Sequence, residues 1–294
     1  MTYPRGDWTP LAADASARRY FVGRVEGREV LLADFGEDAD GLERFVYVRS
    51  LLDDCGVPVP DIYEARPEEG WILQEFVRGR PLSKARWTEG LQRAVLNLAR
   101  GIGSMEGWSD GPELLQLDGA RLRFELAFFK VHFVEGFLNS PAPKDLAPAL
   151  DALAEEVAAY PQVMAHRDFH SENLLERKGG RLVVLDFQDA LLAPRAYDAA
   201  SLAVDPYRRQ GRQLDETFRL LWLAGSTTGS EEFDRTALQR SLKALGTFGY
   251  QITRRKRARY MRFVGPQALR TLDLLSSSPA SLASLRPLLE GLLV

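Results

Sequence analysis

The apolar positions in the first quarter of the chain fall into short runs rich in strand-forming residues. Two of these runs flank Glu26-Gly27, a dipeptide typical of a hairpin turn. Between the second and third runs, the apolar residues of 40–54 recur at helical spacing and end at Gly56 and Pro58, which predicts one helix. The predicted strands are residues 20–25, 29–32, 61–65 and 71–77.

The pattern changes after Arg78-Gly79-Arg80-Pro81, which interrupts the last strand. From Thr88 onward the apolar residues recur mostly at helical spacing, and Thr88 itself can cap the first helix. We therefore expect an α+β fold in two lobes: a small antiparallel sheet with one helix at 1–77, and a larger, mainly helical lobe at 78–294. The helices predicted in the second lobe are 88–105, 120–138, 151–160, 197–208 and several within 213–293.

Composition narrows the class of protein. The chain has 294 residues, 45% of them hydrophobic, and 38 basic and 41 acidic residues give a net charge of −3. This balance gives no general affinity for nucleic acid or anionic membranes. The lone Cys55 has no intrachain partner, and no signal-like start or apolar run of membrane-spanning length is present. We expect a cytoplasmic protein, and we expect the basic run 254–259 to lie inside a helix.

One stretch departs from ordinary core patterning and carries the chemistry. His166-Arg-Asp-Phe-His-Ser-Glu-Asn173 precedes a short predicted hairpin, which ends at Asp186-Phe-Gln188. The order H-R-D-x-x-x-x-N followed by D-F-x is the layout of phosphoryl-transfer catalysis in protein kinases. The hairpin places Asn173 at its entrance and Asp186 at its exit, so both can reach one ion. Carboxylate and amide oxygens suit Mg²⁺.

The remaining acid in that loop, Asp168, is the candidate base for the attacking hydroxyl. The alternative interpretation of the whole stretch from 166 to 188 is a polar loop followed by a helix cap. His166 and His170 are spaced like paired zinc ligands, but the stretch has no helical apolar face, and the only cysteine is remote. We expect His166 to support the loop and His170 to face the substrate.

The nucleotide side is less clearly marked. The small-residue turn of residues 14–20, Asp-Ala-Ser-Ala-Arg-Arg-Tyr, can form a phosphate clamp or a solvated turn. Asp34-Phe35-Gly36 spells the kinase metal motif more literally than Asp186-Phe187-Gln188, but it precedes the catalytic loop by more than a hundred residues and reads as the end of a strand. Adenine is expected beside the lobe boundary, against backbone groups of Gln74, Glu75 and Val77. Asp198 is a predicted N-cap that can also tie down the catalytic loop.

These motifs resemble the aminoglycoside phosphotransferase superfamily, and within it the anomeric kinases of N-acetylmuramate and N-acetylglucosamine. The resemblance implies a protein-kinase-like fold, ATP and Mg²⁺ as cofactors, Asp168 as base, and Asn173 and Asp186 as metal ligands. The glycine-rich loop and the lysine of kinases have no counterpart here, and the sugar-kinase branch also lacks that lysine. The stretches that carry the resemblance are 14–21, 166–173, 186–190, 197–202 and 238–248.

The missing lysine leaves the ATP phosphates to other groups, and Ser16, Arg18 and Arg19 are the candidates. No motif fixes the acceptor pocket. Its candidates are His170, Asp189 and Arg195, which lie near Asp168 and Asp186 in the sequence.

Four functions remain to be weighed. An amino-sugar kinase, acting as a monomer on a small-molecule sugar, fits best. An aminoglycoside or amino-alcohol kinase would call for an acidic pocket, and no acidic cluster follows residue 160. A nucleotide-binding pseudokinase fits the missing lysine but not the intact Asp168, Asn173 and Asp186. A protein kinase is disfavoured, because no A-P-E-like segment follows Asp186.

Overall fold

The computed structural model describes residues 3–4, 6–11, 18–105, 114–208, 212–278 and 280–293, without the side chains of 212–215. The N-terminal part forms a five-stranded antiparallel sheet in the order β1-β2-β3-β5-β4. Each of the four predicted strands is present within two residues at either end. The strands are β1 (Thr9–Leu11), β2 (Arg19–Val25), β3 (Arg28–Asp34), β4 (Ile62–Arg66) and β5 (Trp71–Glu75).

The hairpin between β2 and β3 turns where the sequence predicts. Val25 pairs with Arg28, and the two turn residues Glu26 and Gly27 have positive φ angles of 50° and 79°. Two-residue turns with this left-handed backbone match the twist of a hairpin, and glycine adopts it without a Cβ clash. β3 ends at Asp34, which confirms that the Asp-Phe-Gly sequence there closes an N-terminal strand.

The helix α1 (Ala39–Asp54) connects the sheet with residues 166–188, which are called the catalytic segment. Asp38 caps it by accepting a hydrogen bond from the backbone N–H of Gly41 at 3.0 Å. The buried residues of α1 recur every three or four positions, as predicted. The ring centroid of one of them, Phe45, lies 4.8 Å from that of Phe187, the residue that follows Asp186 in the chain.

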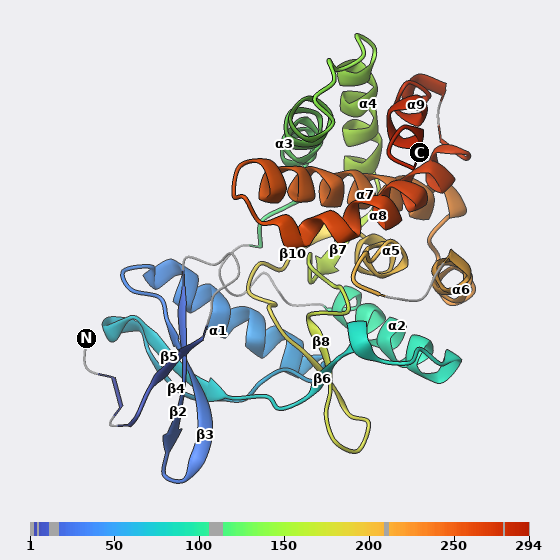
Figure 1. Cartoon of the computed structure of the whole chain (residues 1–294). Coiled ribbons are helices and arrows are strands. Elements are labelled where there is room, and N and C mark those ends of the chain that lie inside the picture. Colours follow the sequence, from blue (N-terminus) through green and yellow to red (C-terminus); the bar gives the residue numbers. More distant parts are fainter. Residues whose placement is uncertain are drawn as a thin grey trace.

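The rest of the chain is mainly helical, with short strands around the catalytic loop. Figure 1 shows the sheet and α1 at one end of the molecule and the helices α3, α4, α7, α8 and α9 at the other, with β7, β10 and α5 between them. The remaining elements are η1 (Pro67–Glu69), β6 (Arg80–Pro81), η2 (Leu82–Lys84), α2 (Glu89–Gly103), α3 (Gly119–Phe129), the π-helical η4 (Lys130–Phe137), α4 (Leu146–Ala158), β7 (Gln162–Ala165), β8 (Leu174–Glu176), β9 (Leu182–Val184), β10 (Leu191–Pro194), α5 (Tyr197–Ala203), α6 (Arg212–Leu223), α7 (Ser230–Thr253), η5 (Ala258–Tyr260), α8 (Met261–Leu275), η6 (Ala280–Leu282) and α9 (Leu285–Glu290).

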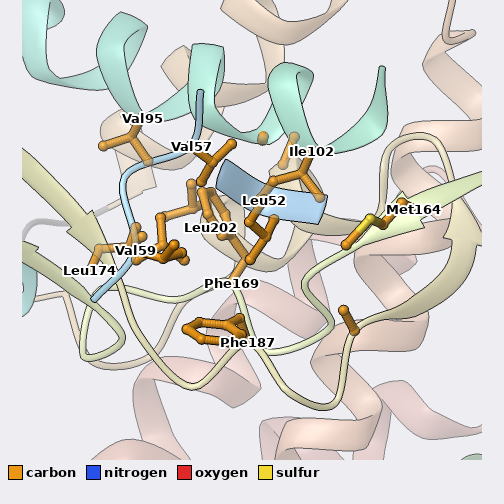
Figure 2. Close-up of a cluster of buried hydrophobic side chains, with 14 of the residues drawn as sticks. Leu52, Val57, Val59, Val95, Ile102, Met164, Phe169, Leu174, Phe187 and Leu202 are labelled. Atoms are coloured by element: carbon orange, nitrogen blue, oxygen red, sulfur yellow. The ribbon is translucent and has the colours of Figure 1, made fainter. Parts of the chain in front are cut away.

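A continuous apolar cluster joins the two parts beneath the catalytic segment. Figure 2 shows Val57 and Val59, which follow α1, among side chains of α2 and of the catalytic loop, including Phe169. Phe169 and Phe187 are both buried, and they bracket the catalytic hairpin. Full burial of a large apolar side chain contributes about 1.5–3 kcal/mol. The catalytic segment is therefore anchored by the core itself.

The long helix α7 packs closely against the segment formed by α3 and η4. A Cβ atom added at Gly246 would lie 2.8 Å from the Cα of Phe129, and one added at Gly249 would meet the carbonyl oxygen of His132. Only glycine permits this approach. The predicted helix at 120–138 is confirmed as helical, although its second half is π-helical.

Three helix predictions need correction at their ends. α7 ends at Thr253, so the basic run 254–259 lies outside it, contrary to expectation. Lys256 has a φ of 57°, and the backbone N–H of Arg257 donates to the carbonyl oxygen of Gln251 at 2.9 Å. This bond spans six positions instead of the four of an α-helix, so the chain leaves the helical path around Lys256. The helix expected over 197–208 ends at 203, and the one expected over 151–160 spans 146–158.

Thr88 caps α2, as predicted, by accepting a hydrogen bond from the backbone N–H of Leu91. Among the helices that the structure describes, none combines the length and apolar character needed to cross a membrane.

Candidate active site

The backbone of the catalytic loop, residues 166–173, is held by a buried carboxylate from α5. One oxygen of Asp198 accepts a hydrogen bond from the backbone N–H of His166 at 2.7 Å, and the other accepts from that of Arg167 at 3.2 Å. The predicted tie between Asp198 and the loop is confirmed. Its predicted N-cap role is wrong, because the N-cap position of α5 is Ala196 and the Asp198 carboxylate is turned toward the loop.

Further contacts fix the path of the loop. Asp205 accepts a hydrogen bond from the backbone N–H of Ser171 at 2.8 Å. The ring Nε2 of His166 donates to the carbonyl oxygen of Leu185 at 2.8 Å, so His166 supports the loop as expected. Arg167 has a φ of 76°, a left-handed conformation that is uncommon for a residue with a side chain. Such strain persists only where the surroundings hold it in place.

Asn173 and Asp186 meet at the open end of the β8–β9 hairpin, as predicted. The side-chain amide of Asn173 donates to the backbone oxygen of Asp168 at 3.0 Å and lies 3.4 Å from Asp186 Oδ2. Gln188 Nε2 donates to Asp186 Oδ1 at 2.8 Å. Asp186 has a φ of 59° and an exposed side chain. Because the amide N–H₂ of Asn173 is engaged by these two oxygens, its carbonyl oxygen is left for another ligand.

The donor set fits Mg²⁺ shared with a nucleotide. No group of three or more His, Cys, Asp or Glu residues that could hold a metal ion occurs in the described part of the chain. One carboxylate and one amide oxygen are too few ligands for an all-protein site. Mg²⁺, however, is usually held by one or two carboxylates together with phosphate oxygens and water. Asn173 and Asp186 therefore fit a nucleotide-bound ion better than a structural one.

Asp168 lies in a pocket between the catalytic loop and α7. Its carboxylate Oδ1 is 3.8 Å from Arg240 Nη2 and 3.8 Å from Lys243 Nζ, and its side chain is 38% exposed, which leaves it within reach of an acceptor. Partial burial raises the pKa of Asp168, but Lys243 and Arg240 outweigh it and hold that pKa well below its usual range.

A second carboxylate, Glu125 of α3, shares these cations. Lys243 Nζ is 3.3 Å from Glu125 Oε1, and Arg167 Nη2 is 3.8 Å from the same oxygen. Gln239 Nε2 donates to Glu125 Oε2 at 2.8 Å. Burial raises the pKa of Glu125, while Lys243, Arg240 and Arg167 lower it by more, so the carboxylate stays ionised at neutral pH.

The pocket beside Asp168 has an aromatic and an apolar wall. His170 lines it, as predicted, and its ring centroid is 4.9 Å from that of Tyr207. Burial lowers the pKa of His170, so its ring is neutral at pH 7. Ala244 and Thr247, one turn along α7 from Arg240 and Lys243, complete the wall.

An arginine of α1 contacts residues 186–190 from the side of the sheet. These residues contain the proposed metal ligand Asp186 and are called the metal segment here. Arg44 donates from Nε to the carbonyl oxygen of Gln188 at 3.2 Å and from Nη2 to that of Ala190 at 2.7 Å. Its neighbour Glu43 is exposed. The contact between α1 and the metal segment is therefore made by the arginine.

The residues expected around adenine lie at the end of β5. Gln74 is buried, and Val77 is half-buried. Both carboxylate oxygens of Glu75 accept hydrogen bonds from Arg177 at 2.6 Å, which ties β5 to the β8–β9 turn. The backbone N–H of Glu75 donates to the carbonyl oxygen of Asp61. The Glu75 side chain is thus a link between the two parts of the chain.

The two arginines proposed for the phosphates face different surroundings. Arg18 lies over the ring of Phe35 at 5.2 Å. Burial raises the pKa of Tyr20, and Arg18 lowers it. The charge of Asp186 adds a smaller rise in this pKa, so the start of β2 lies near the metal segment. Arg19 instead forms an ion pair with the buried Asp34. The third candidate, Ser16, lies outside the described residues.

Neither of the last two acceptor candidates lines the pocket beside Asp168. Asp189 is exposed and accepts a hydrogen bond from Gln188 Nε2 at 3.3 Å, beside Asp186. Arg195 follows β10 at the end of the β7–β10 ladder that is remote from the catalytic loop, and it bonds to Thr227. The structure does not bring Arg195 together with Asp168.

Sequence reasoning missed Arg240, Lys243, Glu125 and Arg44. The signals for the first two were a pair of cations three positions apart and their place in 238–248, a stretch that carries the family resemblance. Glu125 and Arg44 lie in predicted helices and belong to no motif.

Comparisons with known proteins show the family to which the chain belongs. The sequence profile of the phosphotransferase enzyme family matches residues 7–239. A protein named N-acetylmuramate/N-acetylglucosamine kinase from Neisseria meningitidis serogroup B is 30% identical, over 99% of this chain and 92% of its own length. A protein of the same name from Pseudomonas aeruginosa is 28% identical, over 98% of this chain and 89% of its own length.

The fold has solved counterparts. The crystal structure of a spectinomycin phosphotransferase, in complex with ADP and spectinomycin, superposes with a TM-score of 0.62 at 14% identity, over 88% of this chain and 87% of that one. The fold is therefore the protein-kinase-like fold of small-molecule phosphotransferases. The chain belongs to the phosphotransferase enzyme family and is a kinase that transfers a phosphoryl group to an alcohol acceptor.

Proposed function

We propose that the protein phosphorylates the anomeric hydroxyl of N-acetylmuramate or N-acetylglucosamine, with ATP and Mg²⁺, in the recycling of cell-wall sugars. The observation that carries this proposal is the acceptor pocket itself. Asp168 shares it with Arg240 and Lys243, so a neutral or anionic sugar is favoured over a polycationic drug. The relatives that match over nearly the whole chain are named N-acetylmuramate/N-acetylglucosamine kinases, which supports these two sugars as acceptors.

In this proposal Asn173 and Asp186 hold the metal, which offsets the charge of the ATP phosphates. Residues 1–77 form the nucleotide-binding lobe and residues 78–294 the acceptor lobe. Arg18 and Arg19 are proposed for the phosphates, with Ser16, and the backbone near Gln74, Glu75 and Val77 for adenine. His170 and Asp189 are proposed to contact the acceptor. Since ATP is the donor, the enzyme acts in the cytoplasm.

Asp168 orients the acceptor hydroxyl and takes its proton. The hydroxyl oxygen bonds to the γ-phosphorus, the bond from that phosphorus to ADP breaks, and the proton passes to the Asp168 carboxylate. Lys243 and Arg240 hold the pKa of Asp168 low, so it is a weak base. An anomeric hydroxyl is more acidic than an ordinary alcohol and therefore needs the least help from such a base.

A panel of acceptors tests the proposal. ATP consumption is measured with N-acetylmuramate, N-acetylglucosamine, choline and several aminoglycosides at equal concentration. We expect turnover with the two sugars only. Turnover confined to the cationic acceptors would contradict the proposal, and nucleotide binding without turnover on any acceptor would favour a pseudokinase.

A further inference from the structure

The two cations beside Asp168 are held in different ways. Arg240 donates from Nη1 to the hydroxyl of Tyr197 at 2.8 Å and from Nε to Ser201 Oγ at 2.7 Å. Its guanidinium carbon also lies 4.7 Å from the centroid of the Tyr197 ring. Since these partners are buried, Arg240 is fixed in one position.

Lys243 is held more loosely. Its ion-pair contacts are the carboxylates of Glu125 at 3.3 Å and Asp168 at 3.8 Å. Charge-assisted hydrogen bonds from a cation to a carboxylate are shorter, about 2.7–2.9 Å. Lysine carries its charge on a flexible four-carbon stem. The ammonium group can therefore move onto a third anion without breaking a short hydrogen bond.

The ion pairs around the pocket are shared among several groups. Three cations, Arg167, Arg240 and Lys243, contact Glu125 or Asp168, and Arg240 also lies in the field of the buried Asp198. Lys243 is the cation that lines the pocket without a fixed hydrogen-bonded position. A negative charge on a bound acceptor would give its ammonium group a closer partner.

We propose that Lys243 binds a carboxylate carried by the acceptor sugar and so sets a preference for a carboxylate-bearing amino sugar over its neutral analogue. Glu125 holds the ammonium group while no acceptor is bound. This inference rests on the proposed function, because N-acetylmuramate differs from N-acetylglucosamine by one substituent that ends in a carboxylate. The two sugars form a matched pair that isolates the charge.

The test compares kcat/KM for the two sugars in the wild type and in Lys243→Met, which keeps most of the stem. The wild type should prefer N-acetylmuramate, and the ratio of the two values should fall about 10- to 100-fold in the variant, the worth of one charge-assisted contact. Lys243→Arg should keep most of the ratio. Loss of the Lys243 charge also changes the surroundings of Asp168. That effect alters kcat/KM for both sugars alike and therefore cancels in their ratio.

Two further variants separate a local contact from a general field. Lys84 lines a neighbouring pocket that shares Tyr207 with this one but does not include Asp168, and Lys84→Met should change the ratio by less than about twofold. Glu125→Gln removes the competing carboxylate and should raise the ratio. An equal fall in Lys84→Met, or a ratio unchanged by Lys243→Met, would overturn the inference.

Binding distinguishes this inference from the proposed function. Calorimetric titration of each sugar, with ADP and Mg²⁺ present, requires no turnover. If the enzyme binds N-acetylmuramate more tightly through Lys243 but phosphorylates neither sugar, the proposed reaction fails and the inference stands. If both sugars are phosphorylated with equal kcat/KM in the wild type, the inference alone fails. Neither binding nor turnover would reject both.

Discussion

The catalytic loop and the wall of the acceptor pocket on α7 are held by different kinds of contact. In the loop, buried carboxylates accept hydrogen bonds from backbone N–H groups at 2.7–3.2 Å. In the wall, Lys243 and its partners are joined by ion pairs between side chains at 3.3–3.8 Å. The first kind fixes the path of the chain, whereas the second can be rearranged by a ligand.

This difference separates the chemistry from the choice of acceptor. The proposed proton acceptor and metal ligands stand on a loop and a hairpin whose backbone is fixed, so they keep one geometry. The charge on α7 faces the proposed acceptor pocket and can be changed without moving that backbone. Relatives with the same loop could accept different alcohols by exchanging side chains on one helix.

The largest effect is expected at the centre of the loop. Asp168→Ala should lower turnover by about 10²- to 10⁴-fold, because a positioned base is worth that much. The fold and ATP binding should survive, since the Asp168 side chain is not part of the anchors described above. Steady-state kinetics and nucleotide titration measure the two properties. Near-normal turnover would remove Asp168 from this role.

The next effect tests the contrast between the two regions. Asp198→Ala should lower the free energy of unfolding by about 2–4 kcal/mol, because two buried backbone N–H groups lose their acceptor, at about 1–3 kcal/mol each, with some relief from burying a charge. Lys243→Met, at the wall, should lower it by less than Asp198→Ala does, because Arg167 and Gln239 still contact Glu125 after the change. Urea denaturation measures both. Equal losses would contradict the distinction.

The smallest effect is expected at the start of β2. Arg18→Ala should raise the KM for ATP about tenfold, because Arg18 lies on the side of the metal segment and a charge-assisted contact is worth about that factor. Arg19→Ala should raise it less than about threefold, because Arg19 pairs with Asp34. The KM for the acceptor should stay unchanged. Wild-type values in both variants would leave the phosphates to backbone amides and the metal.

The sequence predicts those parts of the molecule that depend on short-range pattern. The turn at Glu26-Gly27, the cap at Thr88 and the placing of Asn173 and Asp186 around one hairpin all follow from neighbouring residues. The end of α7 does not, because the run 254–259 has good helix formers, yet the helix ends at Thr253 and the backbone turns left-handed at Lys256.

The acceptor pocket depends on contacts between distant parts of the chain, which no local pattern reveals. Lys243 meets Glu125 and Asp168 only because α7 packs against α3 and the loop. Arg195 is near Asp186 in sequence, yet β10 carries it to the opposite end of the ladder. Proximity along the chain is thus a poor guide to a pocket built from several elements.

The most direct test of the account is the position of the phosphate in the product. Phosphorus NMR of the reaction with N-acetylglucosamine, ATP and Mg²⁺, together with an assay for the reducing end, distinguishes the candidate hydroxyls. The account predicts a sugar 1-phosphate, with the loss of reducing-end reactivity matching the ATP consumed. A phosphomonoester at the 6-hydroxyl, with the reducing end intact, would contradict it.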